Sequence, residues 1–592
     1  MSIELSLKNS LQVALQTCFG VQEETILLQP TKKDFAGFYT FVTFPYTKSL
    51  RKSPVEIGTA LGQFLRENSA IVSDFNVVQG FLNISIADDA WINALNGLAF
   101  DADFGSFAPN GQSVMVEFSS PNTNKPLHLG HLRNIFLGDS LSRILKANGY
   151  EVTKTCLVND RGIHICKSML AYQQLGNGET PESADLKGDH LIGKYYVLFD
   201  KEYKRQIETL VADGMTKEEA EKKAPWMLEA QALLLKWEQN DPQTRQLWQQ
   251  LNGWVYAGFA NTYQKIGVDF DKTYYESNTY LLGKDVVEQG LSAGVFFKKE
   301  DNSVWIDLSA EGLDQKLVLR GDGTSVYITQ DLGTTDLKFK EFDNDRSIWV
   351  VGNEQDYHFN VLFAIMKRLG RSYANGCYHL SYGMVDLPSG KMKSREGTVV
   401  DADELLTEVI AAATEEGNAK GKIDDFGDEE KQKLFSMLGL GALKYYLLKV
   451  DPQKRMLFNP AESVELHGHT GPFIQYTHAR TRSVLRKAAQ MNVDLSQPAT
   501  TVLLANSEQE VIFCLVQFPD RIADAGRNYS PALLSQYAYE LAKAYNTFYA
   551  DVSILQEPNA ETQRARLLLS RAVADALKKS MGLLGIEVPE RM

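Results

Sequence analysis

The spacing of apolar positions changes from helical to strand-like within the first part of the chain. Apolar residues recur at helical spacing at the start, and strand-like runs follow at 38–44 and 81–86. A stretch rich in Gly, Pro, Ser and Asp at 101–113 is then typical of a linker. The pattern predicts an N-terminal α/β domain over residues 1–107.

A strand–helix–strand unit follows the linker. The apolar run at 114–120 is bounded by turn residues and is typical of a buried strand. After a turn, apolar side chains recur at helical spacing up to Gly149, which is well placed to end the helix, and a second strand-like run occupies 152–158. Because such units form parallel sheets, we expect a doubly wound, Rossmann-type α/β domain.

The rest of the chain divides into a helical interruption, further strands and a helical end. Residues from about 176 to about 270 are polar, rich in Lys and Glu and helical in spacing. Strand-like runs resume at 303–308, 326–329 and 348–351, and helix formers dominate from about 456 onwards. We therefore expect the α/β domain over 108–455 with a helical insertion at 176–270, and an all-helical C-terminal domain over 456–592.

Composition fits a folded protein of several domains. With 592 residues, of which 44 % are apolar and 23 % charged, the chain is too long for one ordinary core. The 75 acidic residues exceed the 61 basic ones and give a formal charge of −14, which taken alone argues against a nucleic-acid partner. Net charge does not describe a local groove, however, so other observations can outweigh it.

Targeting and cysteine patterns favour a cytoplasmic protein. The first residues lack a basic segment followed by an unbroken apolar core, and no apolar run approaches the ~20 residues of a membrane helix. The five cysteines include no CxxC pair, which suits reduced thiols and offers no zinc site. We expect a cytoplasmic location, no membrane contact, no zinc and no metal held by the protein alone.

The segment HLGH at 128–131 carries the most informative pair of side chains. His128 and His131 lie at the predicted start of a helix, where free backbone N–H groups and the helix dipole favour a phosphate. Two imidazoles on one helical face can donate hydrogen bonds to an α-phosphate in the transition state, and Gly130 leaves room for a nucleotide. The alternative is a pair of surface histidines, one of which caps the helix.

A second candidate site is the cationic segment SGKMKSREGTVV at 389–400. Lys391, Lys393 and Arg395 lie between Gly390 and Gly397, and clustered cations on a glycine-hinged loop suit a pyrophosphate leaving group. The alternative is a solvated basic turn. The two motifs together are more specific than either one.

The two motifs resemble signatures of the class I aminoacyl-tRNA synthetases. HLGH is similar to their HIGH motif, and KMKSR at 391–395 is similar to their KMSKS loop. The preceding EFSSPNTNKP resembles the arginyl-tRNA synthetase version, and the similarity extends to the closing LLGIEVPERM. The resemblance implies a monomeric arginine–tRNA ligase whose substrates are L-arginine, an arginine tRNA and ATP with Mg²⁺ on its phosphates.

The resemblance also implies roles for single residues. The implied arginine ligands are Glu117, Asn122, Tyr327, Asp331 and Gln355, and the implied ATP contacts are Gly130, His358, Met392 and Arg395. Carboxylates are natural acceptors for a guanidinium, which presents five donors in a rigid fork. The alternatives are a helix cap for Asp331, a core position for Tyr327 and a satisfied core histidine for His358.

One position departs from the family motif. Ser394 stands where KMSKS has its second lysine, and loss of a cation beside the leaving phosphates lowers the rate unless another replaces it. Many arginine enzymes share this loss and carry a lysine before HIGH, which is Lys125 here. The resemblance thus implies catalytic roles for Lys125, His128, His131, Lys391 and Lys393. The roles of Asn159 and Asp160 stay open, because their segment differs from the commonest family versions.

The C-terminal region resembles the helical anticodon-binding domain of arginyl enzymes. The implied tRNA contacts are Arg480, Tyr545, Tyr549 and Met592. Arginine supplies charge for a phosphate backbone, and aromatic rings offer faces for unstacked bases. The alternative for each aromatic residue is a core position. The N-terminal domain resembles the extra domain that these enzymes use against the outer corner of tRNA.

Two other functions stay open at this point. An HxGH nucleotidyltransferase would activate a small acid without tRNA, but it needs neither 592 residues nor this C-terminal domain. A synthetase-like RNA-binding protein without catalysis is the other, but His128, His131 and Lys391 are intact.

Overall fold

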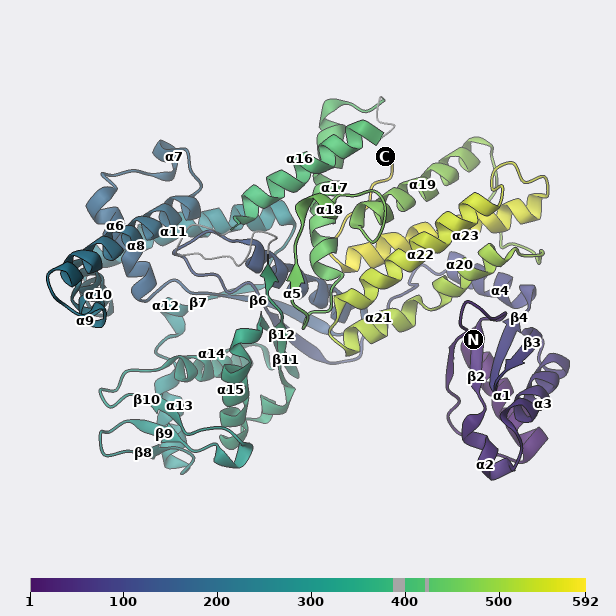
Figure 1. The fold of residues 1–592 in the computed structure, drawn as a ribbon, viewed down its shortest axis with the longest axis horizontal. Helices are drawn as coiled ribbons and strands as arrows, with labels where there is room; N and C mark the ends of the chain where they lie inside the picture. Colours follow the sequence, from purple (N-terminus) through teal and green to yellow (C-terminus); the bar gives the residue numbers. More distant parts are fainter. Residues whose placement is uncertain (1, 387–399, 421–424) are drawn as a thin grey trace.

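A computed structural model describes residues 2–386, 400–420 and 425–592. The N-terminal part of the chain forms an antiparallel sheet covered by helices (Figure 1). The strands run in the order β1-β2-β4-β3, and α3 packs on the sheet with α1 behind it. The elements are α1 (Ile3–Phe19), β1 (Leu28–Pro30), β2 (Tyr39–Val42), η1 (Phe44–Tyr46), α2 (Thr47–Leu50), α3 (Pro54–Asn68), β3 (Val72–Val78), β4 (Phe81–Ile86) and α4 (Asp88–Ala99). The predicted N-terminal α/β domain is confirmed.

The central sheet consists of five parallel strands in the order β12-β11-β5-β6-β7. Its strands are β5 (Ser113–Glu117), β6 (Glu151–Val158), β7 (Lys272–Tyr275), β11 (Arg346–Gly352) and β12 (Cys377–Tyr382). Helix α5 (Leu129–Ala147) links β5 to β6, and α15 (Asp356–Arg368) links β11 to β12. Gly149 follows α5 with φ +85°, and a Cβ there would lie 2.1 Å from the Ala108 carbonyl oxygen. The predicted Rossmann-type domain is confirmed.

Six helices lie between β6 and β7 and form the insertion on the left of Figure 1. They are α6 (Ile163–Leu175), α7 (Pro181–Ala184), α8 (Gly188–Ala212), α9 (Lys217–Lys223), α10 (Pro225–Glu238) and α11 (Pro242–Ile266). Large aromatic side chains such as Tyr195, Phe199 and Trp237 are almost fully buried there. The insertion therefore has a packed interior, although its sequence is polar and charged.

A small three-stranded sheet with its own apolar cluster lies between β7 and β11. Its elements are α12 (Glu276–Thr279), α13 (Gly283–Ser292), β8 (Phe297–Lys298), β9 (Val304–Ile306), η2 (Ser309–Glu311), β10 (Lys316–Leu319) and α14 (Tyr327–Phe342). The strand predicted at 326–329 is wrong, because Val326 is the extended N-cap of α14 and Tyr327 is already helical. Ile328 and Thr329 face the core, and such a short apolar run does not distinguish a helix turn from a strand.

The remaining described residues are mostly helical. They form β13 (Val385–Asp386), α16 (Ala402–Lys420), α17 (Asp428–Leu448), β14 (Met456–Leu457), α18 (Pro460–Ser463), α19 (Gly471–Gln490), α20 (Asn506–Val516), α21 (Phe518–Arg527), α22 (Pro531–Asp551) and α23 (Ala560–Leu583). The N-terminal domain lies beside this bundle (Figure 1), where Gln509 donates to Asp88 at 2.7 Å. None of the described helices combines the length and apolar character that a membrane crossing requires.

Candidate active site

The HLGH segment forms the N-terminus of α5. His128 is the N-cap, and its Nδ1 accepts the backbone N–H of Gly130 at 3.2 Å. Nδ1 of His131 in turn accepts the backbone N–H of His128 at 3.2 Å. Since both Nδ1 atoms are acceptors, the neutral rings carry their protons on Nε2. The capping alternative therefore applies to His128, but the cap uses only Nδ1 and leaves Nε2–H as a donor.

Both histidines are neutral near pH 7. Burial, and then the nearby charge of Lys125, lower the pKa of His128 to about 3. The pKa of His131 lies well below its ordinary value because of burial, His128 and Lys125, in that order. The ring centroids are 3.9 Å apart, so the pair presents two neutral N–H donors at the positive end of a helix. This arrangement suits an anionic oxygen that gains charge during a reaction.

Gly130 makes room for a neighbouring side chain. A Cβ at this position would lie 3.0 Å from Cε1 of His128 and 3.2 Å from its Nδ1. The sequence suggested instead that the glycine makes room for a nucleotide. In the structure its first effect is to let the His128 ring fold back over the helix start.

The cationic segment at 389–400 falls almost wholly outside the described residues. Lys391, Met392, Lys393 and Arg395 are not described. The residues that follow pair directly with HLGH, because Leu129 N–H donates to the Val400 carbonyl at 3.1 Å and Ala402 N–H donates to the Leu127 carbonyl at 3.0 Å. The downstream flank of the segment therefore lies beside the two histidines.

Arg133 ties the same helix to the upstream flank. Its side chain is fully buried, and its guanidinium donates to the carbonyls of Gly383 and Lys454, both at 2.8 Å, and of Pro452 at 3.2 Å. Gly383 lies two residues before β13, which pairs with β14. Sequence analysis did not single out Arg133, because its contacts to the chain before the cationic segment arise only in the tertiary fold.

The predicted carboxylate Glu117 lies at the carboxyl end of β5 and has a buried partner. It forms an ion pair with Lys338 of α14, and the two side chains are 8 % and 3 % exposed. The Lys338 ammonium also lies 5.3 Å from the centre of the Tyr274 ring. Lys338 was not predicted, because it reaches the strand end only through the tertiary fold.

Asp331 of α14 is in contact with His358 of α15, the helix that follows β11. Nε2 of His358 lies 2.6 Å from Oδ2 of Asp331, so the residue predicted for arginine and the one predicted for the nucleotide form one pair. Asp331 lies inside α14 and is not its cap, and Tyr327 is 76 % exposed and is not core. Both alternative interpretations are therefore wrong. Asn122 and Gln355 are exposed where the chain leaves β5 and β11.

Glu276 is a further acidic residue at the carboxyl end of the sheet, directly after β7. Burial raises the pKa of its carboxyl to about 7, against the effect of Arg161, and the charges of Asp160 and Asp331 add to the rise. Asp160 itself is buried and accepts hydrogen bonds from Tyr256 at 2.8 Å and from the Ser277 hydroxyl at 2.7 Å. Asp160 thus joins the insertion to the end of β7, and Glu276 lies beside a concentration of negative charge.

Comparisons with known proteins agree on one family over the whole chain. The family described as "tRNA synthetases class I (R), catalytic domain" matches residues 95–459. "Arginyl tRNA synthetase N terminal domain" matches 5–86, and "DALR anticodon binding domain" matches 474–592. The chain belongs to the class I arginyl-tRNA synthetase family.

Relatives and solved structures of the family cover the chain from end to end. The chain is 54 % identical to "Arginine–tRNA ligase" of Amoebophilus asiaticus and 53 % identical to that of Bacteroides thetaiotaomicron, each over 100 % of both chains. The structure is similar to that of Thermus thermophilus arginyl-tRNA synthetase, with a TM-score of 0.78, 23 % identity and 100 % of both chains covered. At that identity the structural likeness shows the fold.

The residues of this synthetase that were predicted to contact tRNA differ in how exposed they are in the helical domain. Arg480 lies 5.0 Å from the ring centres of both Tyr476 and Tyr549, and these rings are 40 % and 43 % exposed. Tyr545 is fully buried and its hydroxyl bonds Ser570 at 3.1 Å, so the core alternative is correct for Tyr545. Met592 is partly buried against the main apolar core.

Proposed function

We propose that this synthetase joins L-arginine to an arginine tRNA in two steps. In the first, a carboxylate oxygen of arginine attacks the α-phosphorus of ATP, and the bond to pyrophosphate breaks, giving arginyl-adenylate. In the second, a ribose hydroxyl of the terminal tRNA adenosine attacks the arginyl carbonyl, and AMP leaves. Neither step needs a protein nucleophile, so positioning and charge stabilisation supply the acceleration. Mg²⁺ enters on the ATP phosphates as part of the substrate.

The observation that carries the proposal is the pair of neutral histidines at the start of α5. Nε2–H groups of His128 and His131 would donate to the α-phosphate oxygens as negative charge gathers on them. Lys125 lies close enough to His128 to lower its pKa and brings a cation to the same place. We assign Lys391, Lys393 and Arg395 to the pyrophosphate, and Met392 to the nucleotide, from the family motif.

The carboxyl end of the sheet would select arginine by charge. Asp331, held by His358, and Glu276 provide acceptors that a guanidinium matches and a neutral side chain does not. Glu117 would act chiefly through Lys338, because the ammonium already occupies its carboxylate. Exposed Asn122, Tyr327 and Gln355 would complete the polar rim.

The surface around Arg480 would meet the tRNA. Its exposed neighbours Tyr476 and Tyr549 would offer ring faces to bases, while buried Tyr545 would support them from below. We further expect a monomer in the cytoplasm that needs neither zinc nor another protein-held metal.

The test is arginine-dependent ATP–pyrophosphate exchange by the purified protein, with and without total tRNA. Exchange that depends on arginine, and is far weaker with lysine or glutamine, supports the proposal. Exchange with another small acid and no use of tRNA would favour a nucleotidyltransferase. Folded protein that binds tRNA but shows no exchange under any condition would favour a non-catalytic RNA-binding protein.

A further inference from the structure

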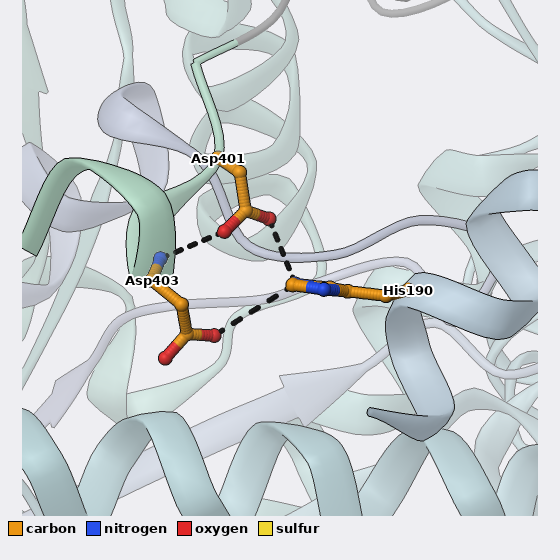
Figure 2. Close-up of side chains that lie close together, drawn as sticks. All are labelled: His190, Asp401 and Asp403. Atoms are coloured by element: carbon orange, nitrogen blue, oxygen red, sulfur yellow. Dashed lines mark hydrogen bonds and ion pairs between the residues drawn. The ribbon is translucent and has the colours of Figure 1, made fainter. Parts of the chain in front are cut away.

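A cluster of charged side chains joins the insertion to the segment that enters α16 (Figure 2). Nε2 of His190, on the first turn of α8, lies 3.0 Å from Oδ2 of Asp401 and 3.8 Å from Oδ2 of Asp403. The other Asp401 oxygen accepts the Asp403 backbone N–H at 2.8 Å. The imidazole therefore points from the insertion into the turn that starts α16.

The cluster is balanced by cations of the protein. Lys187 forms ion pairs with Asp403 and, at 3.2 Å, with buried Asp189, and Lys265 of α11 pairs with Asp403 at 3.0 Å. His190, Asp401 and Asp403 have the spacing of metal ligands, but the two lysines already neutralise Asp403. Three carboxylates thus face two lysines, and a protonated His190 completes the balance. A metal ion would add positive charge to a cluster whose carboxylates the two lysines and His190 already balance.

Asp401 connects this cluster to the reacting end of α5. Its backbone forms an antiparallel bridge with His128. The neighbouring residues close the pairing on both sides, since Leu129 N–H donates to Val400 and Ala402 N–H donates to Leu127. The path from His190 to the His128 backbone therefore has one intermediate residue.

We propose that His190 is a positioning residue for adenylate formation: by holding Asp401, it fixes the backbone bridge that sets the His128 ring at the start of α5. The inference rests on the proposed function and deepens it. It assigns to the insertion helix α8 a direct mechanical link to the histidine pair.

The state of the His190 ring sets the strength of this link. The close contact with Asp401 is the largest cause that raises the pKa of His190; burial opposes the rise, and the charges of Asp401 and Asp189 add to it. Lys187 opposes the rise. A raised pKa means that the ion pair is fully present at low pH and is lost as the pH rises through that value.

His190 is also accessible enough to test without breaking the fold. Its side chain is 26 % exposed and lines a cavity of about 460 Å³ together with His128. The other charged groups that line this cavity are Lys125, Lys194, Lys201, Asp401 and Glu404. Removal of the ring therefore enlarges an existing cavity lined by charged groups and opens no hole in an apolar core.

The experiment compares arginine-dependent ATP–pyrophosphate exchange, in the presence of tRNA, for the wild-type protein, His190→Gln and His190→Ala. Glutamine keeps a donor for Asp401 but never carries charge, so it imitates the neutral histidine. We expect the ratio of wild-type to His190→Gln kcat to fall from about tenfold near pH 6 to about one near pH 9. His190→Ala should be slower than His190→Gln throughout, with the KM for arginine unchanged.

Thermal unfolding separates positioning from folding. His190→Ala should melt within about 3 °C of the wild type. A ratio that does not change with pH, or His190→Ala with wild-type kcat, would overturn the proposal. A wild-type protein without arginine-dependent exchange would overturn the proposed function instead, and the two failures are therefore distinguishable.

A second mutation and a matched control complete the design. If His190 acts through Asp401, then His190→Gln should add no further loss of kcat to Asp401→Asn, whereas additive losses would contradict the path. Arg205→Met, on the same helix, removes an ion pair with Glu202 at 2.7 Å in which the arginine side chain is 66 % exposed. That variant should keep the wild-type kcat and its pH profile, and a pH-dependent loss in it would contradict a specific role for His190.

Discussion

At the scale of single residues, the acidic end of the sheet is distinguished by how its carboxylates are held. Glu117 is neutralised by Lys338, and Asp331 is held by His358. Glu276 differs from both, because burial, and then nearby acidic charge, raise the pKa of its carboxyl to about 7. Under the proposed function, an incoming guanidinium would add a cation beside Glu276, and we therefore expect the ionisation of Glu276 to be coupled to arginine binding.

The variant Glu276→Gln tests this coupling. Loss of the carboxylate should raise the KM for arginine about tenfold or more, because a charge-assisted hydrogen bond is lost, while the KM for ATP stays the same. The pKa of Glu276 is about 7, so the wild-type KM for arginine should fall as the pH rises through 7 and the variant should lose this trend. Exchange rates measured at several pH values give both quantities. A variant with wild-type KM at every pH would remove Glu276 from the pocket.

Lys338 tests the buried ion pair. Lys338→Met leaves the Glu117 carboxylate, 8 % exposed, without its partner, and should cost about 3 kcal/mol of unfolding free energy. Urea unfolding followed by circular dichroism measures the loss. The control is the pair Glu117→Gln with Lys338→Met, which should recover most of the stability. Equal losses in the single and paired variants would show that the methionine, not the charge, is at fault.

Lys338 and Glu276 show what sequence spacing does not contain. HLGH was recognisable because the spacing of His128 and His131 is local and their chemistry depends on a helix start. Lys338 acts on Glu117 from a helix far along the chain, and Glu276 is likewise far in sequence from Asp331, whose charge acts on it. Periodicity along one element cannot report such contacts, so these residues needed the three-dimensional arrangement.

At the scale of elements, α5 combines a structural and a chemical task in one residue. His128 caps the helix through Nδ1 and presents Nε2 on the other side of the ring. Arg133, further along the same helix, fixes the chain before the undescribed segment, and the pairing of Leu127 and Leu129 fixes the chain after it. Contacts at α5 therefore fix the chain both before and after the cationic segment.

Substitution of His128 separates the two tasks. His128→Asn keeps a side-chain oxygen that can cap α5 but loses the Nε2–H donor, so exchange should fall about a hundredfold while thermal unfolding stays as in the wild type. His128→Ala should show the same loss of activity and a further loss of about 1 kcal/mol in stability. Exchange assays and melting curves on the same preparations check both. Wild-type activity in His128→Asn would mean that the cap alone matters.

Elements with consistent patterns were predictable, and one short apolar run was assigned to the wrong type of element. The unit from β5 to β6 followed from its apolar runs and from Gly149, whose positive φ excludes a side chain. The run at 326–329 misled, because Ile328 and Thr329 are β-branched residues on the buried face of a helix turn. Tertiary contacts stabilise the helix there; for example, the Thr329 hydroxyl donates a hydrogen bond to the Val318 carbonyl.

At the scale of the whole molecule, an acidic protein of charge −14 has to bind an anionic tRNA through local features. The cluster of Tyr476, Arg480 and Tyr549 on the helical domain is the feature that we propose for this contact. Arg482 is taken up by an ion pair with Glu590 near the end of the chain, and Arg486 donates to the Glu590 carbonyl. This part of the surface therefore presents exposed aromatic ring faces more than unpaired positive charge to a bound nucleic acid.

Tyr549→Ala should raise the KM for tRNA about tenfold, since stacking of one base on an aromatic ring contributes about 1–3 kcal/mol. The KM for arginine and for ATP should not change, because the ring lies in a different domain from the histidine pair. The matched control is Tyr545→Phe, which removes only a hydroxyl bound to Ser570 in the core. Aminoacylation measured over a range of tRNA concentrations gives all the constants. If Tyr545→Phe weakens tRNA use as much as Tyr549→Ala does, the effect travels through the helical bundle and the exposed ring is not itself a contact.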